Sequence, residues 1–158
     1  MGIRWSLIVL AIALFGRVLK ADFAAGMKAY ESRDYATAAK EWRPLADSGD
    51  AAAQFNLGLM YLDGTGVPQS VEHSVEWFRR SADRGYTKAQ YNLGAMYAVG
   101  RGVRRDYISA HMWLNLCAAS GDEKCIAQRD LVAKRMKARD LQAAQRRAAE
   151  WKPIPAMK

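Results

Sequence analysis

Histidine, cysteine and proline are scarce in this chain of 158 residues, which has two, two and four of them. A zinc site needs about three or four ligands, and His73 and His111 have no third ligand at a useful spacing. A hydrolase needs a nucleophile, a base and an orienting group. No serine begins an S-x-x-K motif, and neither S-D-N nor K-T-G occurs, so serine-type β-lactam chemistry is not expected. The sequence predicts no catalytic site, no metal and no cofactor.

Long apolar runs are also missing, except for a short one near the start. Arg4 precedes the apolar stretch 7–15, which Gly16 ends. Crossing a bilayer takes about 20 apolar residues, whereas a secretory signal peptide has a basic start, a short apolar centre and a cleavage site. This order predicts a signal peptide at 1–21 and a bacterial protein that is periplasmic or secreted. Basic residues just before a cut after Ala21 are unusual, so an uncleaved, membrane-tethered form is the alternative.

The formal net charge of +8 is concentrated at the two ends of the chain. Residues 1–21 carry three basic and no acidic side chains, and residues 124–158 carry ten basic and three acidic ones, which leaves 22–123 at −2. A basic tail suits nucleic acid, but this one lacks the alternating aromatic residues of a stacking platform, and no nucleic-acid partner is predicted. A solvated helical face is one interpretation. The other is weak attraction to an anionic membrane or cell-wall polymer through the basic C-terminal helices.

An internal repeat dominates the middle of the chain. Residues 51–86 and 87–122 agree at 13 of 36 positions, whereas average composition gives only about two or three matches by chance. Each copy has an apolar stripe at helical spacing, a glycine-rich connector and a second apolar helix. We therefore predict two helix–turn–helix repeats, with first helices beginning near 51 and 87. The second helices are expected at 71–83 and 107–119.

An imperfect earlier unit precedes the two copies. Residues 22–50 form a degenerate first repeat, in which Tyr30 corresponds to Tyr61 and Trp42 falls near the position of Trp77 or Phe78. Its connector is shorter and lacks the paired glycines. Terminal units of stacked arrays commonly differ from the rest because one face has no neighbour.

The segment after the second copy also looks helical. Apolar residues predict helices at 124–137 and 139–151, which we interpret as C-terminal capping helices within 123–151. Residues 152–158 contain two prolines, and a flexible tail is expected there.

The positions shared by the two copies resemble the Sel-one-like repeat family, a relative of the tetratricopeptide repeats. Its pattern is A-x-x-x-L-G-x-x-Y-x-x-G-x-G-V, followed later by a tryptophan. The matching residues are Ala53, Leu57, Gly58, Tyr61, Gly64, Gly66, Val67 and Trp77, with Ala89, Leu93, Gly94, Tyr97, Gly100, Gly102, Val103 and Trp113 in the second copy. The resemblance implies an all-α fold, a right-handed α/α solenoid of helix–turn–helix repeats. It covers 51–122 firmly and 22–50 loosely.

In such a solenoid the first helices mainly line the concave side, where extended peptides or helices bind. Polar and thioether side chains recur on these helices, and we interpret them as a partner-binding ladder. The alternative is that they serve packing or hydrogen bonds between repeats. The residues are Gln54, Asn56, Met60, Gln90, Asn92 and Met96.

The two cysteines, Cys117 and Cys125, lie eight positions apart. Two cysteines in an exported chain favour a disulfide. The spacing also resembles the cysteine-rich secreted branch of the family, in which pairs eight apart link consecutive helices. In the alternative, Cys117 fills a small buried site as Ser81 does in the other copy, and Cys125 is free.

Two functions from different classes follow from these observations. The preferred one is an exported interaction module or scaffold that binds peptide or protein partners and is not an enzyme. The other is a cell-wall or β-lactam-binding protein or hydrolase of the cysteine-rich secreted type, which rests on relatives of the family alone, and a shared fold does not transmit function. The identity of the partner is not encoded in any motif.

Overall fold

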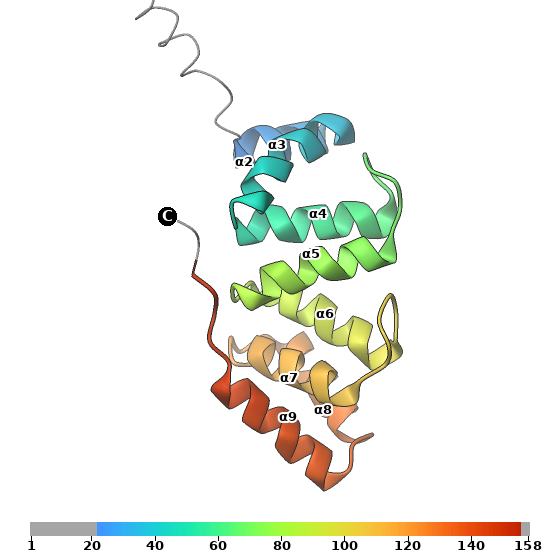
Figure 1. Ribbon diagram of the computed structural model, residues 1–158, viewed down its shortest axis with the longest axis vertical. Helices are drawn as coiled ribbons and strands as arrows, with labels where there is room; N and C mark the ends of the chain where they lie inside the picture. Colours follow the sequence, from blue (N-terminus) through green and yellow to red (C-terminus); the bar gives the residue numbers. More distant parts are fainter. Residues whose placement is uncertain (1–21, 156–158) are drawn as a thin grey trace, which may run out of the picture.

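The structure is a computed structural model that describes residues 22–155. Within this range the chain forms eight α-helices and no strands, stacked in one column (Figure 1). This confirms the predicted all-α repeat solenoid, whereas the predicted signal peptide lies outside the described residues. The helices are α2 (Phe23–Glu31), α3 (Tyr35–Asp47), α4 (Ala51–Asp63), α5 (Val71–Asp83), α6 (Thr87–Val99), α7 (Tyr107–Ala118), α8 (Glu123–Ala133) and α9 (Ala138–Glu150).

Each helix packs against the next one along the chain, from α2 on α3 to α7 on α8. The helix α9 departs from this order and packs against α7. The pairs α4 with α5 and α6 with α7 correspond to the two copies of the repeat. Pairing of sequential neighbours buries one apolar face of each helix without long connections.

Short polar side chains start most of these helices. The carboxylate of Asp50 accepts a hydrogen bond from Ala53 N at 2.7 Å, and the hydroxyl of Ser70 accepts one from His73 N at 3.2 Å. These oxygens satisfy backbone N–H groups that have no partner in the first helical turn. Asp22, Asp34, Asp106 and Asp122 cap α2, α3, α7 and α8 in the same way.

Glycine ends the first helix of each full repeat. Gly64 and Gly100 adopt left-handed backbone angles, with φ of 73° and 77°, and each N–H donates to a carbonyl four residues back at 2.8 Å. Glycine takes this conformation without steric cost. The first helices of both repeats therefore end at a glycine of the connector.

A second glycine lies inside each first helix, where it allows close approach of the second helix. A Cβ on Gly58 would lie 2.6 Å from the ring of Phe78, and one on Gly94 would lie 2.7 Å from the side chain of Leu114. Such distances are shorter than van der Waals contact. The recurrence of glycine in both helices therefore follows from packing.

The degenerate first repeat uses the same device. A Cβ on Gly26 would clash with the indole of Trp42, as a Cβ on Gly58 would clash with Phe78. Trp42 therefore occupies the position of Phe78 and not that of Trp77. The second helices of all three units are in register at an offset of 36 residues, and the shorter connector of the first unit accounts for its weaker match.

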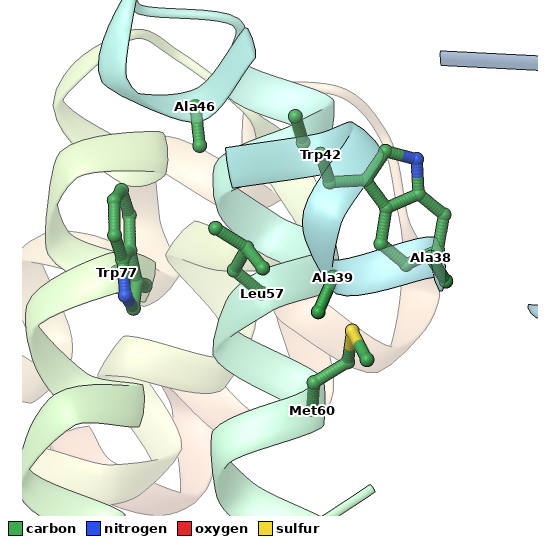
Figure 2. Close-up of a cluster of buried hydrophobic side chains, with 8 residues drawn as sticks. Ala38, Ala39, Trp42, Ala46, Leu57, Met60 and Trp77 are labelled. Carbon is green, nitrogen blue, oxygen red and sulfur yellow. The ribbon is translucent and has the colours of Figure 1, made fainter. Parts of the chain in front are cut away.

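Buried apolar side chains fill the interface between successive units. Around α3 and α4, Trp42, Leu57 and Met60 are almost fully buried, and Trp77 reaches the same cluster from α5 (Figure 2). A second cluster around α5 and α6 contains Phe55, Phe78, Leu93 and Trp113. Complete burial of side chains of this size contributes about 1.5–3 kcal/mol each, so the core holds the units together.

The segment after α9 returns to the middle of the molecule. The ring centroid of Trp151 lies 6.3 Å from that of Trp113, and Ile154 N donates a hydrogen bond to the carbonyl of Asp83 at 2.8 Å. Residues 151–155 thus run from the end of α9 to the end of α5 (Figure 1). Residues 156–158, the last part of the predicted flexible tail, lie outside the described range.

Candidate partner-binding surface

The glutamines of the first helices hold neighbouring units together. Gln54 Nε2 donates to the carbonyl of Ala46 at 2.8 Å, and Gln90 Nε2 donates to the carbonyl of Ala82 at 3.4 Å. Both glutamines are buried, with 2% and 3% of their surface exposed. A buried amide needs such partners because an unpaired one is costly. Their recurrence reflects contact between repeats.

The recurring methionines are buried as well. Met60 has no exposed surface, and Met96 has 5%. They belong to the clusters formed around α4 and α6. For these two methionines and for Gln54 and Gln90, the structure shows the packing and hydrogen-bonding role that the sequence left as the alternative.

The asparagines differ from these four residues. Asn56 and Asn92 are half-buried and lie at equivalent positions of α4 and α6. The nitrogen of Asn56 lies 3.8 Å from Met27 Sδ, a weak contact, and the amide of Asn92 forms no hydrogen bond within residues 22–155. Both amides therefore retain hydrogen-bonding capacity at the open side of the first helices.

Three hollows lie along these first helices. The smallest, about 90 Å³, is bounded by α2, α3 and α4 and includes Asn56. The next, about 210 Å³, lies between α4 and α6 and includes Asn92, Met96 and Val99. The largest, about 310 Å³, also contains Asn92 and extends to the start of α8. Asn92 thus stands between two hollows, where a ligand would meet its amide.

Aromatic and basic side chains surround the largest hollow. Phe55 comes from α4, Tyr91 and Lys88 come from α6, and Lys124 comes from α8. The two lysines are 36 residues apart, so they occupy equivalent positions of successive first helices. Neither forms an ion pair within the part of the chain that the structure describes. A hollow of this composition offers apolar contact together with two cations and one anion, the carboxylate of Asp122, and so has a small excess of positive charge.

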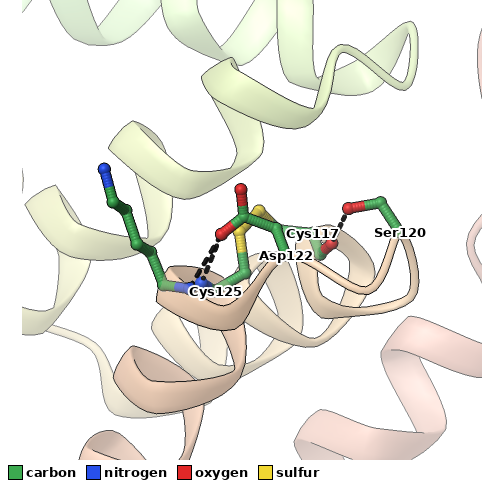
Figure 3. Close-up of a disulfide and its surroundings, with 5 residues drawn as sticks. Cys117, Ser120, Asp122 and Cys125 are labelled. Carbon is green, nitrogen blue, oxygen red and sulfur yellow. Dashed lines mark hydrogen bonds between the residues drawn. A yellow bond between two sulfur atoms is a disulfide. The ribbon is translucent and has the colours of Figure 1, made fainter.

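The disulfide between Cys117 and Cys125 forms one side of the same hollow, which confirms the predicted pairing (Figure 3). Their Cα atoms are 5.7 Å apart, and both side chains are buried. Asp122 caps α8 beside it, and its carboxylate accepts from the backbone N of Lys124 and of Cys125 at 2.8 and 3.1 Å. The bond and the cap fix the start of α8 against the end of α7.

The sequence reasoning missed part of this surface. Tyr91 and Phe55 are equivalent residues of the two copies, and both are aromatic, but they were not singled out because they differ in identity. Lys124 was missed because α8 was not aligned with the repeats. The offset of 36 residues that relates Lys88 to Lys124 is the signal by which it can be found.

The two histidines lie apart from these hollows. His111 in α7 is 3% exposed, and burial, followed by the nearby Arg129, lowers its pKa. His73 in α5 is exposed, with its ring centroid 5.2 Å from that of Tyr61. Within residues 22–155 no three histidine, cysteine, aspartate or glutamate side chains are grouped to hold a metal ion. In the same range no helix has the length and apolar character needed to cross a membrane.

Paired helices stacked at a constant offset define the class of helical-repeat proteins. The profile of the Sel1 repeat matches residues 51–86 and 87–122, the same spans that the internal repeat defines. The chain is a Sel1-like repeat protein. Sel1 repeats are generally scaffolds for protein–protein interaction, and their fold is typically non-catalytic.

The solved structures that are similar to this chain include two bacterial proteins. One is a protective antigen of uropathogenic Escherichia coli with an SLR fold, at 30% identity and a TM-score of 0.75 over 80% of this chain. The other is a Sel1 repeat protein from Oxalobacter formigenes, at 26% identity and a TM-score of 0.67 over 83% of this chain. The chain spans 28% of the first protein and 56% of the second. No curated protein matches it by sequence.

Proposed function

We propose that this protein is an exported scaffold that binds a peptide or protein partner along the hollows of its first helices. The observation that carries the proposal is the free amide of Asn92 between two hollows, with Asn56 at the equivalent position of the preceding repeat. Asparagine amides in this position can donate to and accept from the backbone of an extended peptide.

The largest hollow supplies the second part of the argument. The half-buried Tyr91 offers rigid aromatic surface above the mostly buried ring of Phe55, and aromatic residues are enriched at the buried centres of protein interfaces. Lys88 and Lys124 stand at its edge and favour a partner with negative charge near the contact. The site thus combines apolar contact, an unpaired amide and unpaired cations in one place.

The disulfide supports export. Disulfides form and persist in oxidising compartments such as the bacterial periplasm and are rare in the reducing cytosol. Cys117 and Cys125 form one within the repeat array. Sequencing of the N-terminus of the protein from the extracytoplasmic fraction should give a start near Asp22. A chain that keeps Met1 and stays in the cytosol would contradict export.

The binding surface can be tested with a photo-crosslinking phenylalanine analogue placed in the chain in producing cells. At position 92 it lies between the hollows, whereas at the exposed Glu76 on α5 it lies on a second helix. A partner identified by mass spectrometry at position 92 and absent at position 76 supports the proposal. Equal capture at both positions, or capture at 76 alone, contradicts it.

The asparagines should then determine affinity for that partner. Asn56→Ala combined with Asn92→Ala removes both half-buried amides at the cost of only the weak contact between Asn56 and Met27, so binding should weaken by about tenfold or more, given about 1 kcal/mol per hydrogen bond. The measurement is titration of the purified partner, with circular dichroism as a check of folding. Unchanged affinity would show that the amides do not contact the partner.

A further inference from the structure

The connectors of the two full repeats have the same backbone conformation, but one is uncharged and the other is basic. Residues 64–70 read GTGVPQS and carry no charge, whereas residues 100–106 read GRGVRRD and carry three arginines and one aspartate. Their paired glycines have matching φ angles, 73° and 71° in the first connector and 77° and 68° in the second. The backbone conformation of the second connector therefore does not depend on its arginines.

Two of these arginines join a third one around a cavity. Arg104 and Arg105 from the connector and Arg79 from α5 line a space of about 420 Å³, together with Tyr97, Val103 and Asp106. Arg79 is fixed by a hydrogen bond from its Nη2 to the hydroxyl of Tyr97, at 2.8 Å. This cavity shares no residue with the hollows along the first helices.

The same arginine is present in the preceding unit, where the connector is neutral. Arg43 Nη2 donates to the hydroxyl of Tyr61 at 2.7 Å, which repeats the pair of Arg79 and Tyr97 at an offset of 36 residues. The pair is therefore part of the repeat itself. The two connector arginines are the feature that belongs to the second repeat alone.

Positive charge at this cavity is not neutralised by ion pairs. Within residues 22–155, none of its three arginines forms a salt bridge. The carboxylate of Asp106 caps α7, accepting from Ile108 N at 2.9 Å and from the hydroxyl of Ser109 at 2.6 Å. Burial acts to raise the pKa of Asp106, but the hydrogen bonds from Ser109 and Ile108 outweigh it and lower the pKa, so Asp106 is ionised. The side chains that line the cavity are three cations and one anion, a charge of +2, and Asp83 near Arg79 and Arg147 near Asp106 add one charge of each sign.

We propose that this cavity is a second binding site that takes a phosphate group of an anionic ligand. Guanidinium groups bind phosphate oxygens through paired hydrogen bonds in a fixed plane. A phosphate monoester carries about −1.5 to −2 charge at pH 7, which matches the charge around the cavity better than a single carboxylate does. The phosphate can belong to a lipid headgroup or to a soluble polyphosphate, since both present the same oxygens.

The first repeat supplies the variant that tests the site. Arg104→Pro with Arg105→Gln gives the second connector the residues found at Pro68 and Gln69, which are compatible with this backbone. The introduced glutamine can donate to the carbonyl of Ala98, as Gln69 donates to that of Leu62 at 2.9 Å. The control variant, Arg135→Gln with Lys137→Gln, removes the same charge from exposed positions between α8 and α9.

The probes are tripolyphosphate, titrated by calorimetry, and phosphatidylcholine vesicles with or without phosphatidic acid, whose headgroup is a phosphate monoester, assayed by flotation. We expect the connector variant to bind at least one phosphate probe about tenfold more weakly or worse, because hydrogen bonds between charged groups contribute about 1.5–3 kcal/mol each. The control variant should keep the affinity of the original chain for that probe. Circular dichroism verifies that both variants are folded.

The pattern of loss identifies the source of the phosphate. Loss of tripolyphosphate binding in the connector variant supports a soluble ligand, and loss confined to vesicles that contain phosphatidic acid supports a lipid headgroup. Failure of the original chain to bind either probe overturns the proposal. Equal weakening in the connector and control variants also overturns it, because the loss of binding would then follow from the net charge of the chain and not from the cavity. None of these outcomes depends on the partner of the first helices.

Discussion

The two full repeats have the same framework, and they differ where the array ends. In both, a glutamine donates to a carbonyl of the preceding unit, and a tyrosine hydroxyl accepts from an arginine of the preceding unit. The next first helix, α8, has Ile126 and Ala133 at the glutamine and tyrosine positions. Both hydrogen bonds between units are therefore lost at this step.

A disulfide takes their place. Ser81 in the first copy donates its hydroxyl to the carbonyl of Ala51 at 2.6 Å, and Cys117 occupies the same position in the second copy. Its partner Cys125 stands where the preceding first helix has Ala89. The comparison shows that one position makes two different attachments. Ser81 holds α5 to the first helix of its own unit by a hydrogen bond, whereas Cys117 holds α7 to the following helix, α8, by a covalent bond.

Exchanging the residues of the two copies should have the largest effect on stability. Cys117→Ser with Cys125→Ala gives each position its counterpart from the other repeat, so packing volume changes little. The entropy of closing so short a loop predicts a loss of about 2–3 kcal/mol in the free energy of unfolding. The measurement is urea unfolding followed by tryptophan fluorescence, with the oxidised original chain as reference.

The matched change in the first copy is Ser81→Ala. It removes a hydrogen bond and leaves the carbonyl of Ala51 with one acceptor site unused, so the expected loss is smaller, about 1 kcal/mol. If the cysteine exchange costs no more than Ser81→Ala, the disulfide does not replace the missing hydrogen bonds. The comparison between Ser81 inside the array and the disulfide at its end would then be wrong.

The sequence predicted the arrangement of the helices well because the internal repeat marks equivalent positions in successive units. An offset of 36 residues places the glycines, the tryptophans and the helix boundaries, and the structure confirms the all-α solenoid and the bond between Cys117 and Cys125. The position of α8 was less clear, since a helix that ends at Ala133 was expected to reach 137. Turns after Val132 and Ala133 and an extended Lys137 stop it earlier.

The binding surface was harder to predict because recurrence does not distinguish a contact with a ligand from a contact between repeats. Gln54 and Met60 recur with Asn56 on one helix, yet the structure buries the first two and leaves the third half-buried. A helical turn of 3.6 residues places these three side chains at different angles. Their exposure depends on where the preceding unit packs, which one sequence does not give.

Removal of the tyrosine hydroxyls tests the contacts between units with a smaller expected loss of stability. Tyr61→Phe and Tyr97→Phe each remove the acceptor of an arginine from the preceding unit and leave the ring in place. Each should lower the free energy of unfolding by about 0.5–1.5 kcal/mol. Tyr61→Phe should lie at the upper end because its hydrogen bond is partly buried, whereas that of Tyr97 is exposed. The reverse order in urea unfolding would contradict a role of burial in these bonds.

The smallest expected effect is a dependence on pH that comes from a buried histidine present only in the second copy. Val75 of the first copy corresponds to His111 of the second, and both are buried with 3% exposure. Burial, then Arg129, lowers the pKa of His111, and Asp130 offsets only part of this. The unfolded chain therefore binds a proton more readily than the folded one below about pH 6.5. The free energy of unfolding should be highest at neutral pH and decrease as the pH falls below about 6.5, by at most about 1.4 kcal/mol per pH unit.

The variant His111→Val should flatten this pH dependence in urea unfolding between neutral and mildly acidic pH, whereas His73→Ser, at an exposed position, should leave it unchanged. An identical pH dependence in His111→Val and the original chain would show that other groups cause it.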